Sequence, residues 1–319
     1  MKSKFSSKHV SLLFAVLFLA IYYFQFNVDD LFHSPVLIAC TVLFPCIISF
    51  LWFRRVTILG FFAGFILQWV LFLNVNPYPL QQDNKLAIMS LIPKTYRPET
   101  QFSLTEIQSN VVVYPIIIKP TICSGEGMGI TILQNETELN AYMAAHPNTS
   151  QLMVQSYLEN YPVEIGVCWE KRPWEKEGRV LEIVEKTQQT SVRKFDYHQY
   201  KDHSDQITPA LNQLFNAISQ TIPNMNVCRY DIRLPSIDHL QKGDFKIVEV
   251  NGTMGMRYLG YPIGVLPDVE WYLMRIFMGI HHLVTLQGYS PLNLAKAMYT
   301  SYINAVKCHD WENLYSLYS

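Results

Sequence analysis

The chain has 319 residues, which is enough for one domain of ordinary size with appendages. Lys and Arg number 25 against 26 Asp and Glu, so the formal net charge is −1. This balance excludes a nucleic-acid partner held by bulk positive charge. Hydrophobic residues make up 50% of the sequence and charged residues only 16%, and the apolar excess lies in the first 75 residues.

Three stretches in that region, residues 10–26, 35–53 and 56–73, are apolar and carry no charged residue. Crossing a bilayer takes about 20 apolar residues, roughly 17 at the low end. We therefore expect a membrane anchor of two or three transmembrane helices over residues 1–75. A signal peptide is an alternative for the first stretch, since lysines precede it. Buried helices of a globular core are the other alternative, which three successive stretches without a charged face disfavour.

Basic residues beside these stretches indicate the topology. Three lysines lie within the first eight residues, and Arg54 and Arg55 separate the second and third stretches. Positive charges favour the cytoplasmic side, but three full crossings would then place the remainder outside, and the third stretch is interrupted by Gly60, Gly64 and Gln68. We expect two crossings and a re-entrant or interfacial third segment. This predicts a multi-pass membrane protein with its remaining domain on the cytoplasmic side.

After a linker at residues 74–84, strand-like runs are interspersed with helical patterns, without the regular spacing of βαβ units. Runs typical of strands cover residues 111–118, 130–134, 152–158, 163–169 and 180–186, and helical patterns cover residues 135–145, 209–222 and 268–319. Asn135 and Glu138 fit a capping box that opens the first helix. The pattern favours an α+β fold with antiparallel sheets.

A lysine at the end of an apolar run precedes a glycine-rich segment. Lys119 ends residues 116–119, and Gly125, Gly127 and Gly129 follow. Glycines let backbone N–H groups close on phosphate oxygens, and a lysine on a strand adds a fixed positive charge. The spacing matches neither a dinucleotide-binding fingerprint nor a P-loop, and protein-kinase motifs are absent. A plain flexible turn is the alternative interpretation.

Two runs near the C-terminus, residues 227–234 and 245–251, flank a polar segment and are expected to pair as a hairpin. Each run carries polar residues at alternate positions, which share a face of a strand. They are Arg229, Asp231 and Arg233 in the first run and Glu249 and Asn251 in the second. Pairing would bring Asp231, Glu249 and Asn251 together as oxygen ligands for Mg²⁺, beside two arginines. This combination suits a metal-bound nucleotide.

Taken in order, these motifs resemble the ATP-grasp superfamily, and within it the D-alanine–D-alanine ligase type of carboxylate–amine ligase. The likeness rests on Lys119 with the glycine loop, residues 153–158, Glu164, the Arg229–Asp231 pair and the Glu249–Asn251 pair, and it covers residues 91–260. It implies two α/β lobes with antiparallel sheets that grip ATP. Residues 76–267 would form this catalytic domain, followed by a helical tail at 268–319.

The resemblance implies roles for the phosphate side of the site. Lys119 would contact the phosphates or the adenine edge of ATP. The loop with Gly125, Gly127 and Gly129 would close over the β- and γ-phosphates. Lys94 would match an upstream lysine on the phosphate side.

The resemblance also implies how the nucleoside is held. Backbone groups of Gln155, Ser156, Tyr157 and Leu158 would form a hinge that reads adenine, and Glu164 would hold the ribose hydroxyls. A segment at residues 195–201 is similar to a lid of the same ligases, with its lysine displaced to Lys201.

For the reaction itself, the resemblance assigns Mg²⁺ to Asp231, Glu249 and Asn251 and phosphoryl stabilisation to Arg229. It implies a ligase that forms an amide or peptide bond through an acyl-phosphate, with ATP and Mg²⁺ as cofactors. An ATP-grasp kinase that only phosphorylates its acceptor is one alternative, and a non-catalytic nucleotide-binding membrane scaffold is the other.

The N-terminal region departs from the family. Its members carry an α/β domain before the nucleotide lobes, whereas only residues 74–110 separate the apolar region from Lys119 in this chain. This argues against D-alanine as substrate. We expect small-molecule or lipid-linked carboxylate and amine substrates, with the membrane helices or the tail completing the acceptor site.

Overall fold

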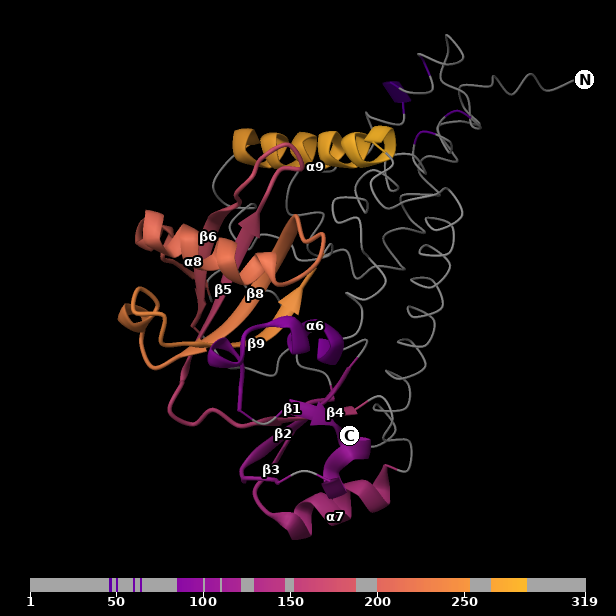
Figure 1. Cartoon of the computed structure of the whole chain (residues 1–319), viewed down its shortest axis with the longest axis vertical. Coiled ribbons are helices and arrows are strands. Elements are labelled where there is room, and N and C mark those ends of the chain that lie inside the picture. The colour runs from indigo at the N-terminus through magenta and orange to yellow at the C-terminus, as the bar shows by residue number, and fades with distance from the viewer. Residues whose placement is uncertain are drawn as a thin grey trace, which may run out of the picture. The chain divides into compact units, whose positions relative to one another are not determined.

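The computed structural model describes Cys46, Ile47, Phe50, Gly60 and Gly64, and residues 85–99, 101–109, 111–121, 129–146, 152–187, 200–252 and 265–285. The chain divides into two compact units. One comprises Met1–Val75 and Leu259–Thr285, and the other comprises Asn76–Tyr258 and Leu286–Ser319. The second unit carries both sheets of the structure (Figure 1).

In the first unit, the longest described element is helix α9 (Val265–Thr285), which confirms the predicted helical tail as far as Thr285. Residues 286–319 of that tail lie outside the described residues. Leu273, Phe277 and Ile280 are exposed at spacings that place them on one side of this helix. No helix among the described residues is long and apolar enough to cross a membrane. The three apolar stretches predicted as membrane segments lie outside the described residues, apart from five isolated positions.

A four-stranded antiparallel sheet begins the second unit, with strand order β1-β4-β2-β3. Its strands are β1 (Gln101–Ser103), β2 (Ile116–Pro120), β3 (Thr131–Leu133) and β4 (Leu152–Ser156). Alternate residues such as Ile116, Ile118 and Val154 are buried in a core shared with helix α7 (Glu136–Ala145). The predicted capping box is confirmed, because the Asn135 side chain accepts a hydrogen bond from the Glu138 N–H at 3.0 Å.

The strand predicted from residue 111 is wrong at its start, since β2 begins only at Ile116. Pro115 has no N–H to donate to a strand ladder, which explains a boundary at this point. Val111 and Val113 precede it and are exposed. The β-branched residues before Pro115 favour a strand by composition, so composition alone does not show that β2 begins only at Ile116.

A five-stranded antiparallel sheet follows, with strand order β7-β6-β5-β8-β9. Its strands are β5 (Val163–Glu170), β6 (Arg179–Lys186), β7 (Tyr200–Asp202), β8 (Val227–Leu234) and β9 (Lys246–Asn251). The predicted hairpin is confirmed as the β8–β9 pair. The α+β class with antiparallel sheets is likewise confirmed.

Helix α8 (Pro209–Gln220) covers one face of this sheet (Figure 1). Thr208 caps the helix by accepting a hydrogen bond from the Leu211 N–H, and proline occupies its first turn. Phe215 on α8 is fully buried and stacks on Phe245, with 5.7 Å between ring centroids. We call this side of the sheet the apolar face; it includes Ile165, Val167, Ile183, Tyr230, Ile232 and Ile247.

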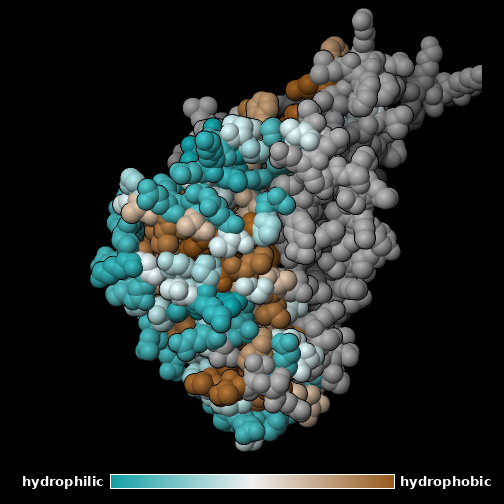
Figure 2. All heavy atoms as spheres, in the orientation of Figure 1, coloured by the Kyte–Doolittle hydropathy of each residue, from teal (hydrophilic) through white to brown (hydrophobic). Residues whose placement is uncertain are grey.

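The visible described surface is mainly hydrophilic, and its hydrophobic residues form separate patches (Figure 2). The apolar side chains between α8 and the sheet are buried, and the helix presents polar residues such as Gln213 and Gln220 to solvent.

A β-bulge in the β8–β9 pairing determines which side chains of β9 point to the apolar face and which point to the opposite face. Asp231 pairs with Glu249, but the next residue, Ile232, pairs with Ile247, so Val248 is an extra residue on β9. Strict alternation would place Ile247 and Glu249 on the same face. The bulge instead lets Ile247 join the apolar core while Glu249 lies opposite Asp231.

Candidate functional site

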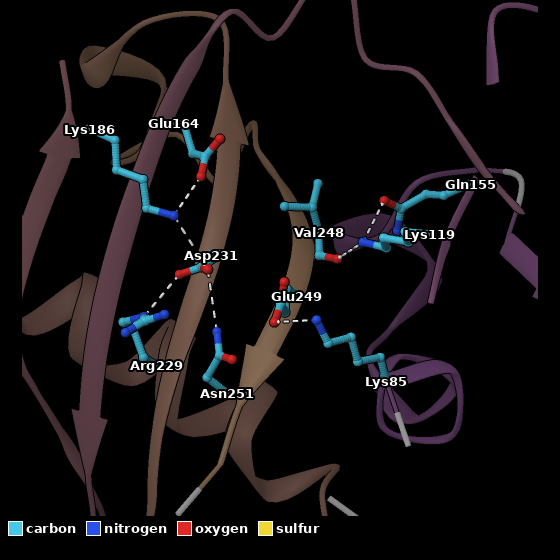
Figure 3. Close-up of polar contacts among 10 residues, drawn as sticks. All are labelled: Lys85, Lys119, Gln155, Glu164, Lys186, Arg229, Asp231, Val248, Glu249 and Asn251. Carbon is cyan, nitrogen blue, oxygen red and sulfur yellow. Dashed lines mark hydrogen bonds and ion pairs between the residues drawn. The ribbon is translucent and has the colours of Figure 1, made fainter. Parts of the chain in front are cut away.

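The face of the five-stranded sheet opposite α8 carries ionisable side chains in place of apolar ones. We call it the polar face. Figure 3 shows six of its members, which are Glu164, Lys186, Arg229, Asp231, Glu249 and Asn251. By the same register, Glu182 and Arg233 also lie on this face. The strand register explains the grouping, because residues paired across strands project to the same side. Arg229 pairs with Asn251, and Asp231 pairs with Glu249 on one side and with Gly166 on the other.

Asp231 lies at the centre of the polar face. It accepts a hydrogen bond from Arg229 Nε at 3.0 Å and one from Asn251 Nδ2 at 3.3 Å, and Lys186 Nζ lies 3.4 Å away. Burial alone would raise the pKa of Asp231, but the charges and hydrogen bonds of Arg229 and Lys186 outweigh it and lower the pKa to about 2. Asp231 is therefore ionised at neutral pH.

Glu164 lies one strand away on β5 and is held by two cations. Lys186 Nζ is 2.5 Å from its Oε1 atom, and Arg233 Nη2 is 2.9 Å from its Oε2 atom. Lys186 thus contacts both Glu164 and Asp231. These contacts join three strands of the sheet, because Lys186 ends β6, Glu164 lies on β5 and Asp231 on β8.

Glu249 is paired with a lysine that the sequence analysis did not identify. Lys85 begins helix α6 (Lys85–Leu91), and its Nζ atom lies 2.8 Å from Glu249 Oε1. The backbone N–H of Lys85 donates to the carbonyl of Thr121, just beyond β2, at 2.9 Å. The helix start is thereby tied to the four-stranded sheet while the side chain reaches the five-stranded one.

Lys119 connects the two sheets from β2. Its ammonium donates to Gln155 Oε1 on β4 at 3.1 Å and to the carbonyl of Val248 on β9 at 2.8 Å (Figure 3). Val248 is the extra residue of the bulge. Lys119 is only 5% exposed, and its burial lowers its pKa from 10.5 to about 8, an effect that Glu249 and Asp231 partly oppose.

The predicted adenine hinge is the segment that leads from one sheet to the other. Gln155 and Ser156 end β4, and Tyr157 and Leu158 follow before β5 begins at Val163. Gln155 is buried, and its amide donates to Gln101 Oε1 at 3.2 Å while its Oε1 accepts from Lys119. The Tyr157 N–H donates to the carbonyl of Pro115 at 3.1 Å. These contacts fix the segment beside Lys119.

Two predicted positions of the glycine loop, Gly125 and Gly127, lie outside the described residues. Gly129 is described and adopts a φ of +72°, a left-handed conformation that glycine favours, just before β3. Lys94 is exposed on the short helix η1 (Lys94–Tyr96). No ion pair or side-chain hydrogen bond joins Lys94 to the site in the part of the chain that the structure describes, whereas Lys85 contacts the carboxylate of Glu249.

Asp231, Glu249 and Asn251 together fit a magnesium ion by their chemistry. They are hard oxygen donors on neighbouring strands, and two of them are carboxylates, which Mg²⁺ prefers. The amide N–H group of Asn251 donates a hydrogen bond to Asp231, so the amide oxygen of Asn251 is the atom that could coordinate a metal ion. No group of three His, Cys, Asp or Glu suited to a metal occurs among the described residues.

Charge is unevenly distributed over the described part of this site. Its carboxylates are Glu164, Glu182, Asp231 and Glu249, and its cationic side chains are Lys85, Lys119, Lys186, Arg229 and Arg233. The excess of cations suits a polyanionic ligand, and the low exposure of Lys119 and Asp231 strengthens each interaction.

Comparison with known proteins identifies the domain. The family model described as the C-terminus of D-Ala–D-Ala ligase matches residues 84–262, more than half of the chain. The chain belongs to this family. The match includes both sheets and the whole polar face, so the chain carries the ligase-type domain, and the predicted ATP-grasp fold with antiparallel sheets is confirmed. No curated protein sequence gave a significant match.

Solved structures that resemble the chain include relatives of the same type. D-alanine–D-alanine ligase from Bacillus anthracis, in complex with ATP, is 14% identical, with 65% of this chain and 67% of that chain covered and a TM-score of 0.40. VanG D-Ala:D-Ser ligase from Enterococcus faecalis is 17% identical, with 63% and 61% covered and a TM-score of 0.41.

An ADP complex of N5-carboxyaminoimidazole ribonucleotide synthetase is 14% identical, with 54% of this chain covered and a TM-score of 0.40. The chain spans only 45% of that protein. It likewise spans only 43% of L-amino acid ligase from Bacillus licheniformis. The family assignment rests on the family model and not on these structures.

Two residues of the site, Lys85 and Lys186, were not identified from the sequence. Lys186 had a usable signal, because alternation along β6 places it on the same face as Glu182, away from the buried Ile183. Lys85 had little, since it lies in a seven-residue helix far from Glu249 in sequence.

Proposed function

We propose that this protein is an ATP-dependent ligase that joins a carboxylate to an amine, with MgATP bound between the four-stranded sheet and the polar face. The observation that carries the proposal is the convergence at the polar face. Two carboxylates and an amide lie beside Arg229 on one sheet, and Lys119 of the other sheet reaches the carbonyl of Val248, the residue next to Glu249. Membership of the D-Ala–D-Ala ligase family supports the same chemistry.

In this proposal, Lys119 and Lys85 bind the phosphates, and the loop with Gly125, Gly127 and Gly129 closes over them. Lys119 is mostly an ammonium at neutral pH, since its pKa is about 8. Lys85 would exchange Glu249 for a phosphate oxygen, a role for which its position is better suited than that of exposed Lys94.

The nucleoside would be held by the segment that links the two sheets. Backbone groups of Gln155, Ser156, Tyr157 and Leu158 would contact adenine, and Glu164 would accept hydrogen bonds from the ribose hydroxyls. Gln155 supports this role because it is buried between Lys119 and Gln101 and cannot turn away without breaking both contacts.

Asp231, Glu249 and Asn251 would hold Mg²⁺, which neutralises phosphate charge when bound. A carboxylate oxygen of the substrate attacks the γ-phosphorus of ATP. The bond between the γ-phosphorus and the β,γ-bridging oxygen breaks, and ADP leaves. The amine then attacks the acyl carbon, phosphate leaves, and the amine nitrogen loses its proton. Arg229 offsets the negative charge that gathers during the first step, and closure over the site excludes competing water.

The test is to incubate the protein with MgATP and candidate pairs of carboxylate and amine and to measure the release of ADP and of free phosphate. We expect both products, together with an amide, and we expect Glu249→Gln to form them much more slowly than the native protein. A phosphorylated acceptor without free phosphate would identify an ATP-grasp kinase instead. Tight nucleotide binding without any turnover would identify a non-catalytic scaffold.

We further propose that residues 1–75 anchor the protein in a membrane, with the ligase domain on the cytoplasmic side. Support comes from the three charge-free apolar stretches and from the exposed Leu273, Phe277 and Ile280 on one side of α9. Cell fractionation checks this proposal: the protein should stay in the membrane pellet after alkaline carbonate extraction. Recovery in the supernatant would contradict it.

Membrane anchoring would favour a lipid-linked acceptor over a free one. In detergent, the protein should then turn over lipid-linked acceptors faster than the corresponding soluble carboxylates and amines. Equal rates on the two kinds of acceptor would contradict this part of the proposal and leave the ligase assignment untouched.

A further inference from the structure

Lys186 contacts two carboxylates of the polar face at once. Its Nζ atom lies 2.5 Å from Glu164 Oε1 and 3.4 Å from Asp231 Oδ2 (Figure 3). The Lys186 side chain is 24% exposed and that of Asp231 only 9%. The ammonium is therefore partly withdrawn from water and shared between two anions.

The strand order allows this reach. β5 lies between β6, which carries Lys186, and β8, which carries Asp231. The residue of β5 that pairs with Asp231 is Gly166, which also pairs with Val184 on β6. Because glycine has no side chain, β5 places none between Lys186 and Asp231 on this face.

The other cations of the cluster have different contacts. Arg233 pairs with Glu164, and Arg229 pairs with Asp231 through Nε. Lys85 pairs with Glu249, the second carboxylate of the proposed magnesium site. Each of the two carboxylates that would bind Mg²⁺ thus has a lysine ammonium beside it.

An ammonium at this position opposes a bare metal ion. Two cations that share one carboxylate repel each other, and the repulsion is strong where water is partly excluded. A divalent ion approaching Asp231 must therefore displace Lys186 toward Glu164. A nucleotide changes this balance, because its phosphates offer the ammonium new anionic partners and bring compensating negative charge.

We propose that Lys186 is a positioning residue that keeps Asp231 from binding a free divalent cation. When metal and nucleotide bind together, Lys186 leaves Asp231, which is then available to the metal. This inference rests on the proposed function, since it takes Asp231 as a metal ligand and Glu164 as part of the nucleotide site. It makes binding of metal and of nucleotide mutually dependent, with Lys186 as the residue that links them.

The experiment is a titration of the full-length protein with Mn²⁺ as a spectroscopic substitute for Mg²⁺, first alone and then with ADP. Lys186→Met keeps most of the length of the side chain and removes its charge. We expect Mn²⁺ alone to bind this variant about tenfold more tightly than the native protein, and Mn²⁺-ADP about tenfold more weakly. Lys186→Arg restores the charge and should return Mn²⁺ affinity toward the native value.

Arg233→Met is the matched control, because it removes a cation that pairs with Glu164 and, within the described residues, forms no ion pair with Asp231 or Glu249. Its effect on Mn²⁺ affinity should be clearly smaller than that of Lys186→Met. A change of equal size in both variants would show a general charge effect and overturn the specific role of Lys186.

Glu164→Gln gives an independent test of opposite sign. Without the Glu164 carboxylate, the Lys186 ammonium is no longer shared between Glu164 and Asp231, so Mn²⁺ alone should bind more weakly than to the native protein. This variant decides the matter if Lys186→Met fails to fold, as judged by its thermal unfolding.

The outcomes separate the two proposals. If the native protein does not bind Mn²⁺-ADP at all, the proposed function is wrong. If the native protein binds Mn²⁺-ADP but Lys186→Met binds Mn²⁺ alone with native affinity, the positioning role of Lys186 is wrong and the proposed function stands.

Discussion

The two faces of the five-stranded sheet differ in what their side chains do. On the apolar face, Phe215 of α8 lies between the rings of Phe245 and Tyr230, and the neighbouring residues are fully buried. On the polar face, Asp231 and Glu249 are paired with cations from two strands and one helix. One sheet therefore supplies stability from one side and chemistry from the other, and substitutions on the two faces should have separable effects.

The largest effect on stability is expected on the apolar face. Phe215→Ala removes a fully buried ring and should lower the free energy of unfolding by about 3–5 kcal/mol. Denaturant unfolding measures this change, with Gln213→Ala as the control, since Gln213 is an exposed residue of the same helix. A loss under about 1 kcal/mol would show that α8 does not anchor the sheet.

On the polar face, Glu249→Gln should reduce turnover by about 10²–10³-fold, because it removes the charge of a proposed metal ligand. The free energy of unfolding should change by less than about 1 kcal/mol, since Glu249 is partly exposed and the new side chain has the same shape. Initial rates and denaturant unfolding measure the two quantities. Asp238→Asn, an exposed carboxylate in the β8–β9 connection, should leave both unchanged.

A smaller effect should appear in the pH dependence of nucleotide binding. The pKa of Lys119 is lowered to about 8, so the free protein loses this ammonium as the pH rises through 8. Affinity for ADP should be nearly constant below pH 7 and should fall by up to about tenfold per pH unit above 8. In Lys119→Arg, the arginine keeps its charge throughout this range, so the affinity of this variant for ADP should not fall as the pH rises through 8. A pH-independent native affinity would argue against Lys119 as a phosphate ligand.

The smallest effect concerns two polar contacts on the helix side of the sheet. Asn212 Oδ1 accepts a hydrogen bond from the Val180 N–H at 2.7 Å, and Asn216 Oδ1 accepts one from the Gly178 N–H at 3.0 Å. Asn212→Ala should lower the free energy of unfolding by about 1 kcal/mol and leave turnover unchanged. A loss of activity without a loss of stability would contradict the division between the two faces.

The sequence predicted the polar face well where alternation is regular. Arg229 and Asp231 are two residues apart on a strand, and so are Glu249 and Asn251, and their flanking residues are apolar. Such a pattern is local and can be read without knowing the fold. The order of these motifs along the chain then indicated the family that the comparison confirmed.

Other features depend on contacts between distant segments. The bulge at Val248 cannot be inferred from the alternation of apolar residues, yet its carbonyl receives the ammonium of Lys119. Lys85 reaches Glu249 because a backbone bond to Thr121 fixes the start of α6. Neither Val248 nor Lys85 belongs to a recognisable sequence motif, and their contacts depend on the arrangement of the two sheets.

The most direct test of the central claim is a crystal structure with Mn²⁺ and a non-hydrolysable ATP analogue, in which anomalous scattering locates the metal. The account predicts one metal peak coordinated by Asp231, Glu249 and Asn251, with the phosphates in contact with Lys119. A nucleotide bound elsewhere, or a metal peak without any of these three ligands, would contradict it.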